Sequence, residues 1–233
     1  MRKQIPNIIT LANLFSGCVA ITMAFQGNFL GVVIWVIVAA GFDFFDGLAA
    51  RALGVQSRLG VELDSLADLV SFGVAPASAL FILLRERSAL PDLFLPLQNI
   101  IPYLAFLIAV FSAYRLAKFN LDERQTNHFL GLPTPANALF WVSYCYGIRH
   151  LSILNESLFY TTVGFLLVLS ALMLSEIPLF SFKIKSLKLK GNERQLLLIV
   201  LIIAFVSLWG IIGIAWGMLA YIAISLFSPE KTR

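Results

Sequence analysis

The residues that decide the fold read DFFDGLAAR at positions 43–51 and GVELDSLAD at positions 60–68. Both stretches lie within long apolar runs, and together they hold four aspartates within 26 residues. A charged side chain in a membrane helix costs roughly 2.5 kcal/mol or more at the bilayer centre. Four such acids in neighbouring apolar segments therefore indicate a functional site built between two helices.

Helical spacing places these acids on facing surfaces. Residues three, four and seven apart return to the same face of a helix. One face of the first helix carries Asp43, Asp46, Gly47 and Ala50, and one face of the second carries Gly60, Asp64 and Asp68. The short turn at residues 54–58 makes the two helices antiparallel neighbours, so we expect the two acidic faces to converge.

The composition is that of a membrane protein. Of the 233 residues, 59% are hydrophobic and 13% are charged, and the mean hydropathy is +0.87. Soluble domains are nearer to half apolar and a quarter charged. We therefore expect an all-α, polytopic transmembrane helical bundle with no nucleic-acid partner. Cys18 and Cys145 lie in apolar runs, and we interpret them as packing residues because two cysteines form neither a disulfide framework nor a zinc site.

Apolar runs long enough to cross a bilayer predict about eight spans. Six of them form the expected core, over residues 8–25, 29–51, 60–84, 98–118, 134–149 and 158–175. The last run, residues 195–227, is too long for one crossing at 1.5 Å per residue, so we expect it to turn near residues 209–213 and cross twice. The predicted parts of the chain are a catalytic core (1–175), a basic cytoplasmic loop (176–194) and a C-terminal hairpin with its tail (195–233).

Charge placement favours this count. With eight spans both termini lie on one side, and that side holds all of the 17 Lys and Arg residues except Arg85, Arg87 and Arg149. The positive-inside rule makes that side cytoplasmic. A single final crossing would instead put Lys231 and Arg233 outside.

Four converging carboxylates repel one another. Asp43 and Asp46 also lie in the last turns of their helix, where the helix dipole disfavours anions. Bound cations would remove both penalties, and hard oxygen ligands with no His or Cys nearby favour Mg²⁺ or Mn²⁺ over zinc. Arg51 and Arg58 flank the acids and could hold phosphate oxygens. Helix packing through small residues is the structural alternative, but it does not explain four acids beside two arginines.

The spacing D-x2-D-G-x2-A-R-x8-G-x3-D-x3-D is matched at every fixed position from residue 43 to residue 68. This pattern resembles the signature of the CDP-alcohol phosphotransferases. The resemblance implies that Asp43, Asp46 and Asp64 bind two divalent ions, Mg²⁺ or Mn²⁺, with Asp68 as a further ligand. It also implies that Asp68 is the catalytic general base.

The same resemblance implies contacts with the CDP group of a lipid substrate. The matching positions are Gly47, Ala50, Arg51, Ser57 and Gly60. The segment PNIIT at residues 6–10 resembles the family's N-terminal contact with the nucleotide and diphosphate, which adds Asn7 and Thr10. A helix-capping role for this Asn or Thr is the alternative.

Three further segments, at residues 71–76, 115–120 and 129–136, resemble the branch of the family whose substrates are CDP-diacylglycerol and L-serine. That branch often has Arg at the position of Lys118. We expect the acceptor's carboxylate or phosphate to be bound by Ser71, Arg115 and Lys118. Anchoring at the membrane surface is the alternative role for the two cations.

The resemblance also implies a homodimer. We expect the protein to lie in the inner membrane of a bacterium, and the distribution of Lys and Arg predicts an active site that faces the cytoplasm. The expected reaction transfers a phosphatidyl group to serine and releases CMP. One alternative is another family member, such as phosphatidylglycerophosphate synthase, whose acceptor carries a phosphate. The other is an ion-coupled transporter that uses the acids as an ion pathway, although transporters more often show inverted repeats or broken helices near the midplane.

Overall fold

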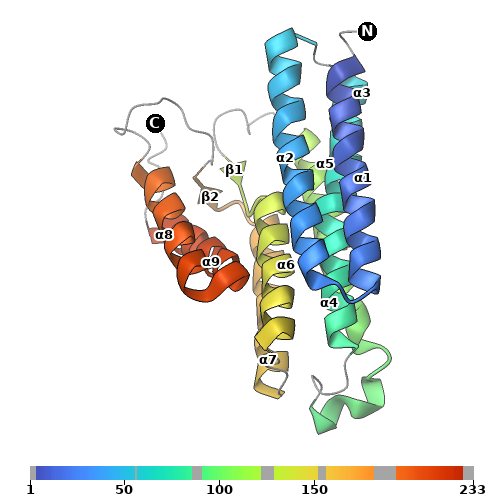
Figure 1. The fold of residues 1–233 in the computed structure, drawn as a ribbon, viewed down its shortest axis with the longest axis vertical. Helices are drawn as coiled ribbons and strands as arrows, with labels where there is room; N and C mark the ends of the chain where they lie inside the picture. Colours follow the sequence, from blue (N-terminus) through green and yellow to red (C-terminus); the bar gives the residue numbers. More distant parts are fainter. Residues whose placement is uncertain are drawn as a thin grey trace.

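The computed structural model describes residues 4–55, 57–85, 91–121, 129–151, 156–180 and 193–227, which form long packed helices (Figure 1). The α-helices are α1 (Ile5–Phe25), α2 (Phe29–Leu53), α3 (Arg58–Asp68), α4 (Ala75–Leu84), α5 (Leu107–Leu121), α6 (Thr134–Leu151), α7 (Glu156–Leu174), α8 (Glu193–Trp209) and α9 (Gly213–Phe227). A π-helical turn spans Leu69–Val74, and 3-10 turns span Asp92–Leu97, Ile101–Phe106 and Gly210–Ile212. This helical architecture confirms the predicted all-α class.

The turn between α2 and α3 brings the two acidic stretches together. Gly54 ends α2 in the left-handed conformation, with φ of 62°, which glycine adopts without a side-chain clash. Ser57 begins α3 as its N-cap, because its side-chain oxygen accepts a hydrogen bond from the Gly60 amide at 3.0 Å. These two caps reverse the chain within a few residues, so the C-terminal half of α2 lies antiparallel to α3.

α3, the π-helical turn and α4 form one continuous helix from Arg58 to Leu84, close to the predicted span at residues 60–84. Its middle is the π-helical turn, which starts directly after Asp68. Turns of this kind are rare and occur mostly as single insertions in α-helices, often at functional sites. The turn changes the direction of the side chains that follow Asp68, which a spacing argument based on regular α-helix does not anticipate.

Six segments of the described chain are long and apolar enough to cross a membrane. They are Ile5–Phe25, Phe29–Leu53, Arg58–Leu84, Ile101–Leu121, Ser157–Leu174 and Glu193–Phe227. The predicted count of eight adds α6, which does not meet this standard, and takes the last segment as two crossings. The count of eight and the cytoplasmic position of both termini therefore stay predictions.

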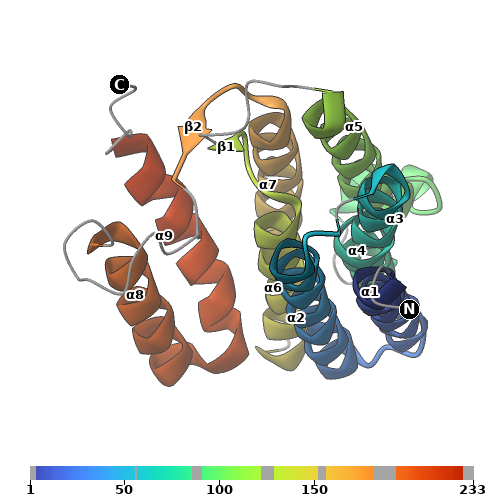
Figure 2. The same cartoon turned by 90° about the horizontal axis from the view of Figure 1, so that it is seen from above.

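The low hydropathy of α6 follows from its central place. Figure 2 shows α6 beside α2 and α7, with α8 and α9 on one side and α1 to α5 on the other. Twelve of its 18 residues are buried, including Asn137 and Ser143, whereas Leu198 is the buried residue of α8. A helix that packs against protein on most sides has less need of an apolar surface than one that faces lipid.

The long final run turns at Gly210–Ile212, within the predicted residues 209–213. Gly210 has φ of 68°, and the two helices cross closely at two further glycines. A Cβ on Gly213 would lie 2.5 Å from the Val206 nitrogen, and one on Gly217 would lie 2.5 Å from Ile202 Cγ1. The small residues of α9 therefore allow close packing of the hairpin, which lies against α6 (Figure 1).

Two short strands are a difference from the predicted all-helical chain. β1 (Phe129–Leu130) pairs antiparallel with β2 (Pro178–Leu179), in register Phe129 to Leu179. The Gly131 amide also donates to the Ile177 carbonyl at 3.0 Å. The pairing fastens the segment before α6 to the segment after α7, and two-residue strands leave no periodic pattern for a sequence to show. The basic residues 183–190 of the predicted cytoplasmic loop lie outside the described residues.

We predict that Gly17→Ala destabilises the protein. A Cβ at Gly17 would lie 2.8 Å from the Ser71 Cα, so α1 and the π-helical turn must separate, at a cost of about 1–3 kcal/mol. The matched control is Gly41→Ala on α2, where an added Cβ meets nothing within 4 Å. Thermal unfolding in detergent should show a lower midpoint for the first variant and an equal or higher one for the second. Equal midpoints would contradict the close approach of α1.

Candidate active site

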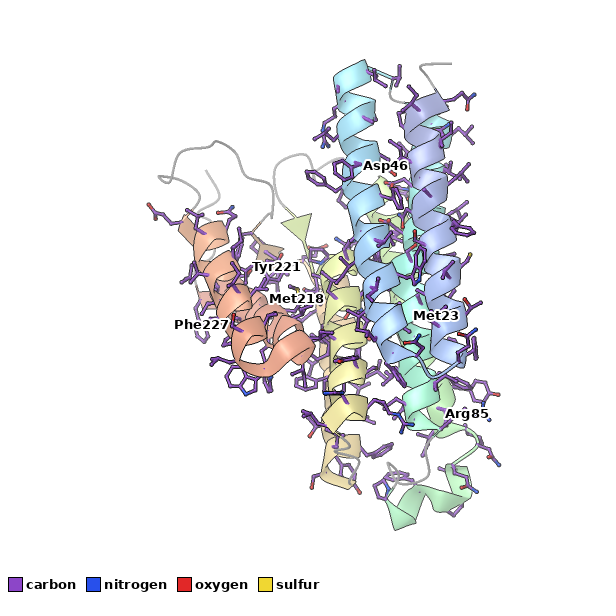
Figure 3. The ribbon with its side chains drawn as sticks, in the orientation of Figure 1. Met23, Asp46, Arg85, Met218, Tyr221 and Phe227 are labelled. Carbon is purple, nitrogen blue, oxygen red and sulfur yellow. The ribbon has the colours of Figure 1, made fainter. Side chains whose placement is uncertain are left out.

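The four aspartates line one cavity of about 490 Å³. Its walls come from α2, α3, α5, the start of α6 and the C-terminal part of the chain. In Figure 3, Asp46 lies in the upper half of the bundle and Arg85 near the opposite end. The cavity therefore belongs to the end of the bundle at which α2 ends and α3 begins.

Three of the acids form a compact group. Asp43, Asp64 and Asp68 each offer a carboxylate oxygen, and these three oxygens all lie within 4.8 Å of one another. Asp46 stands beside this group, where its Oδ2 accepts a hydrogen bond from the Thr10 hydroxyl at 2.7 Å. Helix α2 thus contributes two acids in different surroundings, one within the group and one bonded to α1.

The surroundings of the acids fit a divalent cation. Asp46 is 6% exposed and Asp68 is 8% exposed, and the Oδ1 atom of Asp64 is buried without a hydrogen-bond partner among the described residues. Within this part of the chain none of these acids forms an ion pair, since the one salt bridge joins Lys118 to Glu176. Converging, poorly compensated hard oxygens suit Mg²⁺ or Mn²⁺.

Arg115 brings positive charge to the same cavity. Its side chain is 8% exposed, and its Nη1 donates to the Thr134 hydroxyl at 3.2 Å. The Nε of Arg115 is buried and has no hydrogen-bond partner among the described residues. A buried guanidinium with a spare donor beside a cavity can bind a carboxylate or phosphate.

The other two residues expected to bind the acceptor lie elsewhere. The Lys118 ammonium forms an ion pair with Glu176 at 3.4 Å, and Lys118 does not line the cavity. The Ser71 hydroxyl is fully buried and donates to the Asn13 carbonyl of α1 at 3.0 Å. The structure thus brings Arg115 to the acids and directs Ser71 toward α1.

The residues expected to contact CDP fall into two groups. Gly47 and Arg51 line the cavity, and Ala50 lies one turn after Asp46 on α2. The others gather where α1 and α3 begin: a Cβ on Gly60 would lie 3.3 Å from Asn7 Oδ1 and 3.2 Å from Ser57 Oγ. This contact brings Asn7, Ser57 and Gly60 together, whereas Thr10 is directed to Asp46.

Sequence reasoning missed three features of this site. Asn13 donates to Asp68, and it could have been found as a polar residue three positions after Thr10 in an apolar helix. Asn120 of α5 donates to Ser65 of α3 at 2.8 Å. Tyr221 of α9 also borders the cavity, and no local pattern marks it, because its position depends on how the C-terminal hairpin packs.

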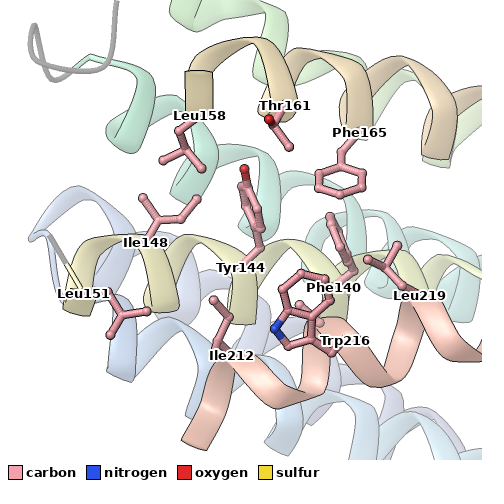
Figure 4. A pocket seen from close by; sticks show the side chains of 11 residues that line it. Phe140, Tyr144, Ile148, Leu151, Leu158, Thr161, Phe165, Ile212, Trp216 and Leu219 are labelled. Carbon is pink, nitrogen blue, oxygen red and sulfur yellow. The ribbon is translucent and has the colours of Figure 1, made fainter. Parts of the chain in front are cut away.

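A second cavity, of about 240 Å³, lies between α6, α7 and α9 (Figure 4). Its walls are mostly apolar or aromatic, as at Phe140, Phe165 and Trp216, with Thr161 as the exception. Its two hydroxyl groups have partners, since the Tyr144 hydroxyl bonds to the Thr162 hydroxyl and Thr161 donates to the Ser157 carbonyl. Among the described residues, the lining of this cavity includes no carboxylate, histidine, lysine, arginine or cysteine. The acidic cavity is therefore the candidate active site.

Comparison with known proteins agrees with this geometry. The sequence model of the family described as CDP-alcohol phosphatidyltransferase matches residues 3–227. The chain belongs to this family. The resemblance seen in residues 43–68 is thereby confirmed, and the protein is an integral membrane protein, as its apolar helices indicate.

Several curated relatives carry the name CDP-diacylglycerol–serine O-phosphatidyltransferase. The protein of Bacillus subtilis (strain 168) is 38% identical over 133 residues, which cover 57% of this chain and 70% of the relative. The protein of Helicobacter pylori (strain J99) is 32% identical over 206 residues, covering 87% and 80%. The protein of Methanocaldococcus jannaschii is 33% identical over 165 residues, covering 70% of each.

We predict that Asp64→Asn weakens the binding of Mn²⁺ by roughly tenfold or more, because it removes one charge and one ligand from the compact group. The measurement is the electron paramagnetic resonance signal of free Mn²⁺ titrated with the purified protein. Glu62→Gln is the matched control, since Glu62 lies on the same helix but is exposed. Equal affinities for the two variants would exclude Asp64 from the metal site.

Proposed function

We propose that the protein transfers the phosphatidyl group of CDP-diacylglycerol to the hydroxyl of L-serine, giving phosphatidylserine and CMP. The observation that carries the proposal is the single cavity in which three clustered aspartates stand with a buried arginine. The acids suit a reaction at a diphosphate, and the arginine suits an acceptor that bears an anionic group. The names of the family relatives support serine as that acceptor.

The acids would hold the divalent ions. Asp43, Asp64 and Asp68 converge, and Asp46 lines the same cavity. We propose two ions, Mg²⁺ or Mn²⁺, shared among these four residues. When bound, such ions supply positive charge that offsets the diphosphate and the developing charge on the leaving group.

Asp68 is the proposed general base. In the proposed step the serine hydroxyl oxygen forms a bond to the phosphorus that carries the diacylglycerol, the bond from that phosphorus to the CMP oxygen breaks, and the hydroxyl proton passes to Asp68. Asp68 is the most enclosed acid of the compact group, at 8% exposure. Its burial limits competition from water for the phosphorus.

Arg115 is the proposed contact for the serine carboxylate. Its Nη1 donates to Thr134, and the other N–H groups of the guanidinium, which lines the cavity, are the proposed donors to the acceptor. Serine binding at this point would place its hydroxyl toward the aspartates of the same cavity. Lys118, paired with Glu176, and Ser71, bonded to α1, are not needed in this arrangement.

The CDP group would occupy the end of the cavity at which α2 and α3 meet. Gly47 and Ala50 leave room beside the acids, and Arg51 can reach a phosphate. Asn7, Ser57 and Gly60 form a polar cluster close to the starts of α1 and α3. Thr10 of α1 donates to Asp46, so its proposed contribution to the nucleotide site is to position this acid.

The position of the cavity suits substrates of mixed character. It lies toward one end of the helices, where soluble serine and CMP can exchange while acyl chains remain in the bilayer. The excess of Lys and Arg on the predicted inner side supports an active site that faces the cytoplasm of a bacterial cell. A homodimer is part of the proposal, supported by the family resemblance alone.

We predict serine-dependent release of CMP from purified protein in detergent with CDP-diacylglycerol and Mn²⁺ or Mg²⁺. Asp68→Asn should lower this rate by roughly a hundredfold or more, the usual contribution of a general base. Release with glycerol 3-phosphate and not with serine would identify another member of the family. No release with any acceptor would favour an ion-coupled transporter.

We also predict that Arg115→Gln raises the KM for serine by roughly ten- to a hundredfold, as expected for the loss of a charged hydrogen bond. The KM for CDP-diacylglycerol should change little. Arg85→Gln is the matched control, because Arg85 lies at the opposite end of the bundle from Asp46 (Figure 3). An unchanged KM for serine in the Arg115 variant would rule out the proposed carboxylate contact.

A further inference from the structure

Asn13 is a fully buried polar residue in the apolar helix α1. Its Nδ2 donates a hydrogen bond to the Oδ1 of Asp68 at 3.2 Å, across 55 residues of sequence. Neither the signature at residues 43–68 nor the expected nucleotide contacts include it. The residue therefore touches the proposed base without belonging to any predicted part of the site.

Two contacts fix Asn13 in place. The carbonyl of Asn13 accepts a hydrogen bond from the Ser71 hydroxyl at 3.0 Å. One turn along α1, Gly17 lies so close to Ser71 that an added Cβ would be 2.8 Å from the Ser71 Cα. Ser71 is three residues after Asp68, so α1 contacts the Arg58–Leu84 helix directly beside this acid.

The burial of Asn13 is not explained by stability. Its Oδ1 is buried and has no hydrogen-bond partner among the described residues. An unsatisfied buried acceptor destabilises a fold, whereas an apolar side chain of similar shape carries no such penalty. The unsatisfied Oδ1 of Asn13 destabilises the fold, while its Nδ2 donates to the proposed base. This combination indicates a role for Asn13 in the reaction.

The chemistry of an amide suits this role. A donor on one carboxylate oxygen fixes the rotamer of the acid and leaves the second oxygen for a ligand or a proton. An amide is uncharged, so it orients Asp68 without neutralising it, as Lys or Arg would. Thr10, three residues earlier on the same face of α1, donates to Asp46 in the same way. Helix α1 thus presents two neutral donors to two of the four acids.

We infer that Asn13 is a positioning residue for the transfer reaction, acting through Asp68. This inference rests on the proposed function, in which Asp68 takes the proton of the acceptor hydroxyl. Asn13 is not among the residues that line the cavity, so in the proposed arrangement it acts through Asp68 and not by contact with the substrate. It sets the direction from which the Asp68 carboxylate meets the acceptor and the neighbouring acids Asp43 and Asp64.

The test compares Asn13→Leu, which keeps the approximate shape and removes the donor, with Asn13→Ala, which removes the side chain without adding a branch. Ser16→Ala is the matched control, because Ser16 is also buried in α1, but among the described residues its hydroxyl bonds to the Ala12 carbonyl of its own helix alone. Three quantities are measured for each variant: kcat and KM from CMP release, Mn²⁺ affinity without substrates, and the thermal midpoint.

For both Asn13 variants we expect kcat to fall by roughly ten- to a hundredfold, the range seen when a residue that orients a functional ligand is lost. The KM values for CDP-diacylglycerol and serine should stay within about threefold of the original, Mn²⁺ affinity should weaken, and the thermal midpoint of Asn13→Leu should change little. Ser16→Ala should match the unaltered protein in all three quantities.

An unchanged kcat per folded molecule in Asn13→Leu and Asn13→Ala would overturn the inference. If the thermal midpoint were lower at the same time, Asn13 would be a packing residue only. If the unaltered protein releases no CMP with any acceptor, the proposed function fails by itself. In that case the Mn²⁺ affinity tests whether Asn13 positions Asp68. Weaker binding in the Asn13 variants, but not in Ser16→Ala, would support this role, and equal affinity in all variants would refute it.

Discussion

The structure depends on holding four carboxylates together inside an apolar bundle. Repulsion among the acids and their removal from water both oppose this arrangement. The turn between α2 and α3, capped by Gly54 and Ser57, fixes the acids on facing helices. The compact group of Asp43, Asp64 and Asp68 then has geometry, charge and burial that suit a divalent ion and a diphosphate. The repulsion among the acids is therefore concentrated at the site where a bound cation would offset it.

Helix α1 offsets part of the cost of burying the acids through hydrogen bonds, without neutralising their charge. Thr10 and Asn13 lie on one face and donate to Asp46 and Asp68. Gly17, on the next turn, allows the close approach that these hydrogen bonds require. The N-terminal helix is therefore part of the site, although it carries none of the signature residues. Asp43 and Asp64 receive no such donor among the described residues, which leaves them available to a cation.

The part of the cavity around Arg115 is assembled from distant parts of the chain. Arg115 of α5 bonds to Thr134 at the start of α6, and Tyr221 of α9 borders the same space. The pairing of β1 with β2 fixes the segment that leads into α6. The C-terminal hairpin, expected as a separate part, thus reaches the cavity that holds the four aspartates.

The sequence by itself determined the helical class, the antiparallel pair of acidic helices and the family, because helix periodicity and the cost of buried charge act locally. It also indicated Asp43, Asp46, Asp64 and Asp68 together, since their spacing places them on two faces. Only the tertiary structure decided that Asp46 bonds to α1, that Ser71 faces Asn13 rather than the cavity, and that Tyr221 borders it. These outcomes depend on a π-helical turn and on contacts between helices far apart in the chain, and neither leaves a periodic signal in the sequence.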